Sequence, residues 1–181
     1  FATAESVTLK FHTFVPMPAN SNAKFVKPWA DKVANESNGE IKVEMYPSMQ
    51  LGGAPPQLVD QVRDGVVDIV WTVAGYTPGR FPRLEVFELP FMPATATATS
   101  QAIQEYVDTV AAEDLKDYKV LAVHVHAPGK IHTKNRLIKS ASDLKGLKMR
   151  GPTRPITQML EKLGATPVGM PVPKVAPSLS K

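Results

Sequence analysis

The stretch "VVDIVWTV", from Val66 to Val73, decides the fold class. It is a nearly continuous apolar run in which Asp68 is the main interruption. A short run of this kind, rich in β-branched residues, suits a strand that is buried on both faces, as the strands of parallel sheets are. The loop-forming sequence "AGYTPGRFP" follows it. The run therefore predicts a parallel sheet with helices on both sides.

The segments before this run alternate between strand and helix patterns. Apolar residues at every second position predict strands at residues 7–14 and 41–46. Residues 22–36 carry a helical pattern, and residues 51–65 should form a loop followed by a short helix with proline in its first turn and a glycine C-cap. Pro28 should kink the first helix or lie near its start. This β-α-β-α-β order predicts an α/β domain with right-handed crossovers. In the first strand one face should be apolar and the other polar, with Val7, Leu9 and Phe11 opposite Thr8, Lys10 and His12.

A second, β-rich α/β unit should begin near residue 120. A helix is predicted from about residue 97 to 115 and ends the first lobe, to which we assign residues 1–118. Residues 119–181 then form an incomplete second lobe. It should contain a buried strand at 119–125, a short strand at 130–134, a capped turn at 140–146, a strand at 148–150, an amphipathic helix at 153–164 and a strand at 165–170.

The composition excludes several classes of protein. The chain has no cysteine, so it can hold no disulfide, thiolate zinc site or cysteine nucleophile. No apolar run approaches the ~18 residues that a membrane span needs. The net charge is +4, with the basic excess in residues 101–181. The sequence has no dense Lys/Arg block with interleaved aromatic residues, the pattern that would indicate a nucleic-acid-binding protein. The opening "FATAES" is typical of a mature chain after removal of a signal peptide, or of simple trimming.

No signature of catalysis is present. The sequence lacks the G-x-S-x-G elbow, the G-x-x-x-x-G-K phosphate loop and the G-x-G-x-x-G fingerprint. His124 and His126 should share one face of a predicted strand and could ligate a metal, but no third ligand stands at a recognisable spacing. We therefore expect that the protein is not an enzyme and that it binds neither a metal ion nor a cofactor.

Two residues are candidates for ligand binding. Within "DLKGLKMRGP", Arg150 ends a short apolar strand just before a Gly-Pro break. A guanidinium matches a carboxylate with two parallel hydrogen bonds, although composition alone favours a surface salt bridge for this residue. Trp71 lies near the carboxyl end of its strand, where open α/β sheets bind ligands, and core packing is the alternative.

Three long segments resemble the extracytoplasmic solute-binding subunit of TRAP transporters, the DctP family. They are "HTFVPMPANSNAKFVKPWADKVANESNGEIKVEMYPSMQLGG", "DGVVDIVWTVAGYTPGRFPRLEVFELPFM" and "LKGLKMRGPTRPITQMLEKLGATPVGMPV". The resemblance extends beyond these segments and covers essentially the whole chain. The resemblance implies a two-lobed, type II-like periplasmic binding fold, here truncated within the second lobe. It also implies capture of a small organic acid and its delivery to a membrane permease by a monomeric periplasmic protein.

The resemblance also assigns residues to the ligand site. The family's arginine, which clamps the substrate carboxylate, falls on Arg150, and a second basic residue falls on Lys130. The mainly apolar or aromatic nature of the remaining positions suggests a ligand with an apolar or aromatic tail. These positions are Val15, Met17, Trp71, Val73 and Tyr76 on the first lobe, and Thr153 and Val172 on the second.

Two other functions remain as alternatives. An enzyme on a similar α/β scaffold could use Arg150 to position a carboxylate substrate, although the sequence shows no nucleophile–base pair. A ligand-sensing domain of a signalling protein would bind in the same way.

The family's chains also continue through a further ligand contact, a long shared helix and a helical cap, so the chain should be part of a longer one.

Overall fold

A computed structural model describes residues 6–180. Residues 1–5, which carry most of the expected mature N-terminus, and residue 181 lie outside the described residues. Contacts divide the chain into two compact units, Phe1–Val73 and Ala74–Lys181. The lobe boundary expected after residue 118 stays a prediction.

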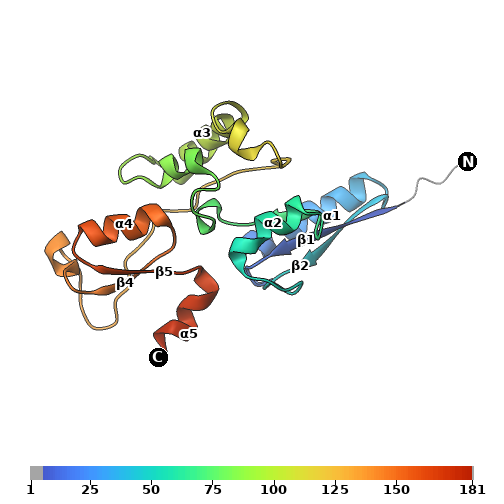
Figure 1. The fold of residues 1–181 in the computed structure, drawn as a ribbon. Coiled ribbons are helices and arrows are strands. Elements are labelled where there is room, and N and C mark those ends of the chain that lie inside the picture. The colour runs from blue at the N-terminus through green and yellow to red at the C-terminus, as the bar shows by residue number, and fades with distance from the viewer. Residues whose placement is uncertain (1–5, 181) are drawn as a thin grey trace, which may run out of the picture. The chain divides into compact units, whose positions relative to one another are not determined.

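The first unit contains the predicted parallel sheet (Figure 1). Its strands are β1 (Val7–Thr13), β2 (Ile41–Tyr46) and β3 (Ile69–Trp71), in the order β2-β1-β3. Both neighbours of the central strand run parallel to it, and Phe11 pairs with Met45 on one side and with Ile69 on the other. The α/β class and the β-α-β-α-β order are thus confirmed.

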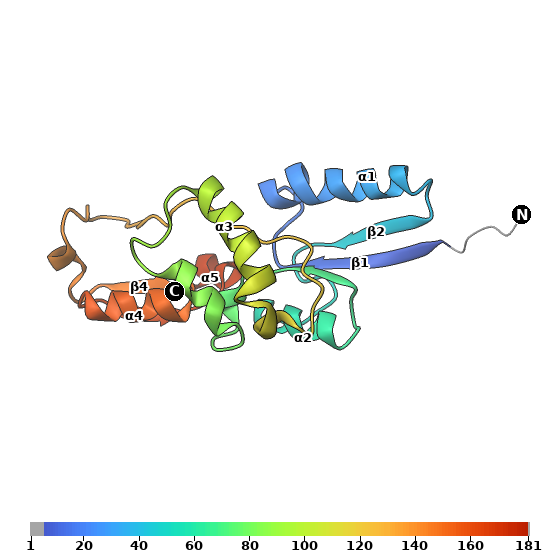
Figure 2. The same cartoon turned by 90° about the horizontal axis from the view of Figure 1, so that it is seen from above.

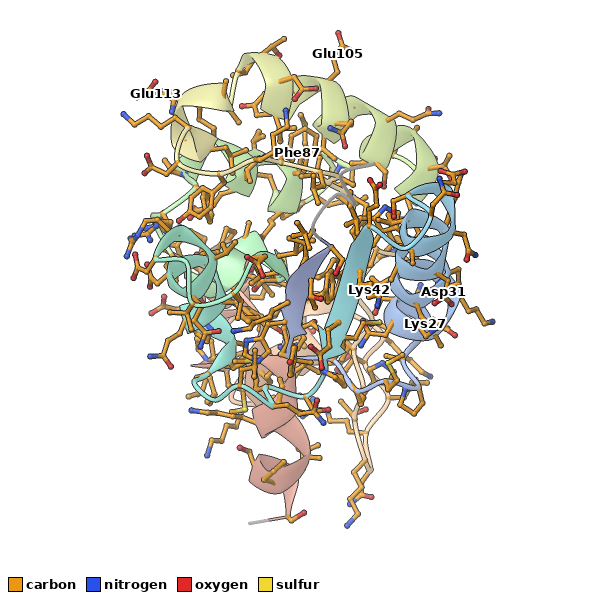
Figure 3. All side chains as sticks on the ribbon, turned by 90° about the vertical axis from the view of Figure 1, so that its right-hand side faces the viewer. Lys27, Asp31, Lys42, Phe87, Glu105 and Glu113 are labelled. Atoms are coloured by element: carbon orange, nitrogen blue, oxygen red, sulfur yellow. The ribbon has the colours of Figure 1, made fainter. Side chains whose placement is uncertain are left out.

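Two helical segments cover the sheet on opposite sides (Figure 2). A π-helical turn, η1 (Asn22–Val26), leads into α1 (Lys27–Glu36), and a 3₁₀ turn, η2 (Pro55–Gln57), leads into α2 (Leu58–Arg63). Pro28 lies in the first turn of α1, directly after the π-helical turn, whose last residue, Val26, has helical dihedrals (φ −65°, ψ −45°). The helical backbone therefore continues through Pro28, and the change from π- to α-helical hydrogen bonding comes just before the residue that lacks an N–H. Pro28 lies near the start of α1, as predicted, but inside a longer helical segment. Figure 3 shows Lys27 and Asp31 together on α1, where they form an ion pair one turn apart.

Because helical segments cover both sides of the sheet, the burial of β1 differs from the expected pattern of one apolar and one polar face. His12 was predicted on the polar face, opposite Leu9 and Phe11, and it is fully buried. Alternating apolar and polar residues mark a solvent-exposed face only in a sheet that is covered on one side. Here helices cover both sides of the sheet. The third strand is shorter than the apolar run predicts, because Val66 is 55% exposed and only residues 69–71 join the ladder. These three residues are half-buried at the edge of the described sheet.

The second unit begins with helical segments. These are the 3₁₀ turns η3 (Ala74–Tyr76) and η4 (Pro82–Glu88), the helix α3 (Ala96–Thr109) and a further 3₁₀ turn, η5 (Ala112–Leu115). The helix predicted at 97–115 is therefore interrupted after residue 109. The ring of Phe87, labelled in Figure 3, meets that of Tyr106 edge-on at 5.1 Å between centroids, which packs η4 against α3.

A small parallel β-α-β element follows in the same unit. Strands β4 (Lys148–Gly151) and β5 (Thr166–Gly169) are joined by α4 (Arg154–Lys162), as the sequence predicts. The expected capped turn is η6 (Ala141–Leu144). The chain continues into η7 (Val172–Lys174) and α5 (Val175–Leu179). A core of Leu144, Leu160 and Ala165 packs against Ile138, Met149 and Ile156.

The strands expected at 119–125 and 130–134 are wrong. Residues 119–138 form no regular structure, and Leu121 is 60% exposed. The N–H groups of Val123 and Val125 donate instead to side chains of α3, namely Gln104 and Ser100, at 3.0 Å each. A strand exists only where a neighbouring strand accepts its ladder bonds. Among residues 6–180, no strand pairs with this segment.

Candidate functional site

In the first unit, the order β2-β1-β3 creates a topological switch point. The chain leaves β1 on one side to form β2 and comes back past it to form β3, so the connections diverge at β1. In open α/β sheets, ligands bind outside the carboxyl ends of the strands at such a point. Here those ends carry Thr13 and Trp71, which are register partners. The hydroxyl of Thr13 donates to the carbonyl of Trp71 at 3.2 Å.

This edge brings together two of the predicted site residues, Val15 and Trp71. The N–H of Val15 donates to the Thr13 hydroxyl at 3.4 Å, next to the bond that Thr13 makes to Trp71. The rings of Phe14 and Trp71 lie 5.5 Å apart at a 35° tilt. Val15, Met17, Trp71 and Val73 are all half-buried. The edge is thus an apolar, partly exposed surface with an aromatic side chain.

A buried asparagine that the sequence analysis did not single out holds the loop after β1. The Asn22 amide donates to the carbonyls of Val15 and Pro16, at 3.1 and 3.2 Å, from the first residue of the π-helical turn. The Val15 carbonyl also accepts the N–H of Ser48 at 3.1 Å. Asn22 is fully buried, and its Oδ1 atom has no hydrogen-bond partner among the described residues. The N–H of Ala19 also donates to the Pro16 carbonyl at 3.0 Å, so four hydrogen bonds to two successive carbonyls leave this loop little freedom.

The "QLGG" segment is held by His12. The ring nitrogen Nε2 accepts the N–H of Leu51 at 3.4 Å, so Nδ1 carries the proton and donates to Gln61 Oε1 at 2.8 Å. The Gln61 amide then donates to the carbonyl of Gly52 at 3.2 Å. A Cβ atom at Gly53 would lie only 2.9 Å from Gln61 Nε2, in a backbone conformation with φ +84°. The glycine is therefore required by both its backbone and its neighbour.

Arg150 lies near the end of β4, as predicted, and is half-buried. Its Nε donates to the carbonyl of Met170 at 3.0 Å, while Nη2 is buried without a hydrogen-bond partner among the described residues. Leaving such a donor unpaired is costly, about 1–3 kcal/mol or more for a charged group. The next residue, Gly151, faces α4 so closely that a Cβ atom there would lie 2.6 Å from Thr157 Cγ2. The arginine is thus held at both its backbone and its side chain.

Tyr76 and Val172, two further predicted residues, meet directly. The N–H of Val172 donates to the Tyr76 hydroxyl at 3.1 Å. Val172 follows two residues after Met170, whose carbonyl holds Arg150. A continuous series of contacts therefore connects Tyr76 to the arginine.

Thr153 is buried beside an acidic residue that the sequence analysis missed. Its hydroxyl donates to the carboxylate of Glu88, and both residues pack against Gly75, where a Cβ atom would collide with either. Burial raises the pKa of the Glu88 carboxyl above its ordinary value, and the nearby charge of Glu85 acts in the same direction. The hydrogen bond from Thr153 and the proximity of His126 oppose that rise in pKa.

Lys130 is not gathered with these residues. It is exposed in the irregular segment, and within residues 6–180 no described hydrogen bond or ion pair joins it to Arg150. Its contact with a ligand stays a prediction. In the described part of the chain, His124 and His126 belong to no group of three residues that could hold a metal ion.

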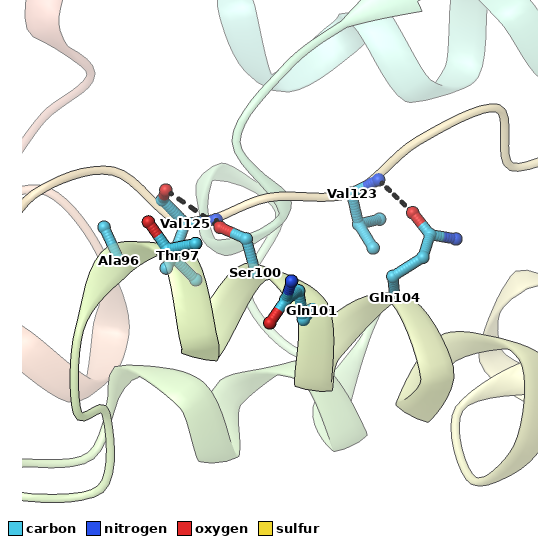
Figure 4. A pocket seen from close by; sticks show the side chains of 7 residues that line it. All are labelled: Ala96, Thr97, Ser100, Gln101, Gln104, Val123 and Val125. Atoms are coloured by element: carbon cyan, nitrogen blue, oxygen red, sulfur yellow. Dashed lines mark hydrogen bonds between the residues drawn. The ribbon is translucent and has the colours of Figure 1, made fainter.

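A shallow hollow of about 700 Å³ lies between α3 and the segment at 123–125 (Figure 4). The figure shows Ser100 and Gln104 bonded to the backbone of Val125 and Val123. None of its lining residues is charged, and none belongs to the predicted site. A carboxylate would find no counter-charge there, so the residues around Arg150 are the better candidate.

Comparison with known proteins agrees with the sequence resemblance. Residues 13–181 match the family described as bacterial extracellular solute-binding protein, family 7, DctP. The chain is 32% identical over 147 residues to the sialic acid-binding periplasmic protein SiaP of Vibrio cholerae, covering 80% of this chain and 46% of that protein. The described residues contain no helix long and apolar enough to span a membrane.

Two solved structures are also very similar. One is a TRAP solute-binding protein from a marine metagenome, specific for aromatic acid ligands and bound to 3-hydroxybenzoate. It is 82% identical, with a TM-score of 0.95 over 97% of this chain and 55% of that one. The other, from Rhodoferax ferrireducens, contains copurified benzoate and is 60% identical, with a TM-score of 0.94 over 97% and 54% of the two chains.

These relatives confirm the predicted family, fold class and periplasmic location. They are solute-binding transport proteins rather than enzymes. The chain spans about half the length of the relatives that it matches. It belongs to family 7 of the bacterial extracellular solute-binding proteins, the solute-binding subunits of TRAP transporters.

Proposed function

We propose that this chain is the ligand-capturing part of a protein that binds small aromatic carboxylates and delivers them to a TRAP permease without chemical change. The observation that carries the proposal is the buried Nη2 group of Arg150, which has no partner among the described residues. A ligand carboxylate would supply the missing acceptor. The bond from Nε to Met170 keeps the guanidinium in place before the ligand arrives.

The aromatic part of the proposal has two supports. The switch-point edge of the first unit offers half-buried apolar residues and the Trp71 ring, which suit a flat apolar group. The two solved relatives contain 3-hydroxybenzoate and benzoate. The individual ligand contacts of Val15, Met17, Trp71, Val73, Tyr76, Thr153, Val172 and Lys130 stay predictions, as does the monomeric state.

The first test is native mass spectrometry of the complete natural chain, purified without added ligand. A small mass that is released on denaturation and matches an aromatic acid would support the proposal. Calorimetric titration then compares benzoate with benzamide, which has the same ring and size but no charge. If benzamide binds as tightly as benzoate, the carboxylate is not what the site recognises.

Substitution of the arginine tests the clamp itself. Arg150→Met should weaken benzoate binding on the order of 100-fold, because charge-assisted hydrogen bonds are lost. Arg150→Lys should weaken it roughly tenfold, since lysine keeps the charge but not the planar fork. Lys148→Met, an exposed residue on the same strand, is the matched control and should leave affinity unchanged. Equal affinity in Arg150→Met and the wild type would overturn the clamp.

A further inference from the structure

Two carboxylates on one 3₁₀ turn hold the start of α4. Glu85 and Glu88 are three residues apart in η4, and a 3₁₀-helix has three residues per turn, so both lie on one side. They accept hydrogen bonds from two consecutive residues at the start of α4, Thr153 and Arg154. We call these four residues the η4–α4 clasp.

Each half of the clasp is a specific contact. Arg154 Nη2 donates to both oxygens of Glu85, at 2.9 and 2.8 Å, and Glu85 also accepts the N–H of Gly79 at 3.3 Å. The Thr153 hydroxyl donates to Glu88. The Glu85 side chain is 19% exposed but that of Arg154 is 45% exposed, so solvent screens this ion pair, whereas Thr153 is buried and its bond to Glu88 is better protected.

The clasp also complements the helix electrostatically. Thr153 is the N-cap of α4 and Arg154 its first residue, and the first turn of α4 contains no acidic side chain of its own. The partial positive charge of a helix N-terminus is stabilised by nearby anions. Glu85 and Glu88 supply that negative charge from another element. The position and tilt of the first turn of α4 are therefore fixed from outside the helix.

The first turn of α4 lies directly behind the arginine. Only Gly151 and Pro152 separate Arg150 from Thr153, and proline restricts its own backbone and that of the residue before it. Gly151 contacts Thr157 so closely that even a methyl group would not fit. A shift of α4 is therefore transmitted to the end of β4 rather than absorbed by a flexible linker.

We propose that Glu85 and Glu88 are positioning residues for Arg150, which they hold in ligand-binding geometry through the first turn of α4. This inference rests on the proposed function, because its readout is carboxylate affinity. Neither glutamate needs to touch the ligand. The clasp fixes the guanidinium from the backbone side, and the Met170 carbonyl fixes it from the side-chain end.

The test is a double-mutant cycle for benzoate affinity in the complete natural chain. The Glu85→Gln/Glu88→Gln variant should bind benzoate roughly tenfold more weakly in the wild-type background, in line with loss of charge-assisted bonds. The same pair of changes should have less than about a twofold effect in an Arg150→Met background, because residues in one network are not additive. Glu161→Gln, an exposed site on the far half of α4, is the control for charge and should change neither value.

Other outcomes separate the possibilities. Equal losses in both backgrounds would show a general structural role and overturn the positioning proposal. Tighter binding by Glu88→Gln would show that its carboxylate merely repels the ligand, which overturns it as well. A wild-type chain that binds no carboxylate would overturn the proposed function and the positioning role together.

If the double variant does not fold, two milder substitutions at Thr153 test the same proposal. Thr153→Val removes the hydroxyl that Glu88 accepts, and Thr153→Ser keeps it. Valine should weaken benzoate binding and serine should restore most of it. The ¹⁵N resonance of Arg150 Nε should shift in the valine variant and stay near the wild-type position in the serine variant. No shift and no loss of affinity in either would overturn the proposal.

Discussion

The N–H of Val172 donates to the hydroxyl of Tyr76 at 3.1 Å, which joins two residues that lie 96 positions apart. The bond is partly buried, and Tyr76 itself is only 9% exposed. It connects η3 to the start of η7 within the second unit. Both partners belong to the predicted ligand site, so this contact couples local stability to the shape of that site.

Replacement of Tyr76 by phenylalanine keeps the ring but removes the acceptor. We expect the free energy of unfolding to fall by about 1–2 kcal/mol, because the Val172 N–H is left without its partner. Urea titration measures this change. Tyr118→Phe is the control, since the bond that the hydroxyl of Tyr118 accepts from Arg80 is long, at 3.4 Å, and exposed. An equal effect of both variants would contradict a special role for Tyr76.

His12→Leu should destabilise the first unit and loosen the "QLGG" segment. The change removes partners of Gln61 and of the Leu51 N–H from a fully buried position. We expect a loss of about 1–3 kcal/mol, since the half-buried Gln61 amide and the Leu51 N–H lose their hydrogen-bond partner. Amide hydrogen exchange should accelerate at Leu51. His132→Leu, at an exposed position, should leave stability and exchange unchanged.

Gly151→Ala should damage the arginine strand without removing any polar contact. The added methyl group would lie 2.6 Å from Thr157 Cγ2 and 3.1 Å from the Thr157 nitrogen, so strand and helix must separate. Overpacking of this kind costs about 1–3 kcal/mol. Benzoate affinity should fall with stability. Adding Thr157→Ser, which removes the nearer clashing atom, should recover part of both, and a lack of recovery would point to another cause.

Asp143 should make the capped turn before β4 sensitive to acid. Hydrogen bonds from the N–H groups of Lys139 and Ser140 hold the pKa of the Asp143 carboxyl below its ordinary value of 3.8. A group with a lowered folded-state pKa stabilises the protein fully above the unfolded pKa and loses that contribution as pH falls through the folded value. Wild type should therefore be more stable than Asp143→Asn at pH 7.

The difference between Asp143→Asn and the wild type should shrink below about pH 4, as the wild-type carboxyl takes up its proton. Urea titrations at pH 7 and pH 3 measure it. Glu113→Gln is an informative comparison, because a side-chain hydrogen bond from Lys116 lowers the pKa of that exposed carboxyl on a different element. A difference for Asp143→Asn that stays constant with pH would contradict the assignment to the carboxylate.

Local patterns predicted most strands and helices of the two parallel elements. The alternation at residues 7–14 and the amphipathic pattern at 153–164 correspond to β1 and α4. The apolar pattern at 119–125 was equally clear, but it does not reveal whether a neighbouring strand exists. The burial of His12 was not predicted, because the cover on its side comes from Leu51 and Gln61, far along the chain.

The site was predictable only in part for the same reason. Arg150 stands in a recognisable motif, and the structure gives it the fixed side chain and free donor that a carboxylate clamp needs. Asn22 and Glu88 have no local signal. Asn22 acts through backbone carbonyls, and Glu88 acts on a hydroxyl 65 residues away. Contacts of this kind depend on tertiary structure and cannot be deduced from spacing.

The strand order of the first unit also has a consequence for synthesis of the chain. The middle strand, β1, is made first, while its two neighbours are made only with Ile41 and Ile69. No hairpin can protect it in the meantime, because both pairings are parallel and need long crossovers. Such non-local pairing is slow to form. A nascent chain therefore leaves at least one edge of β1 unpaired until about Trp71 has been made, and during this interval a chaperone would matter most.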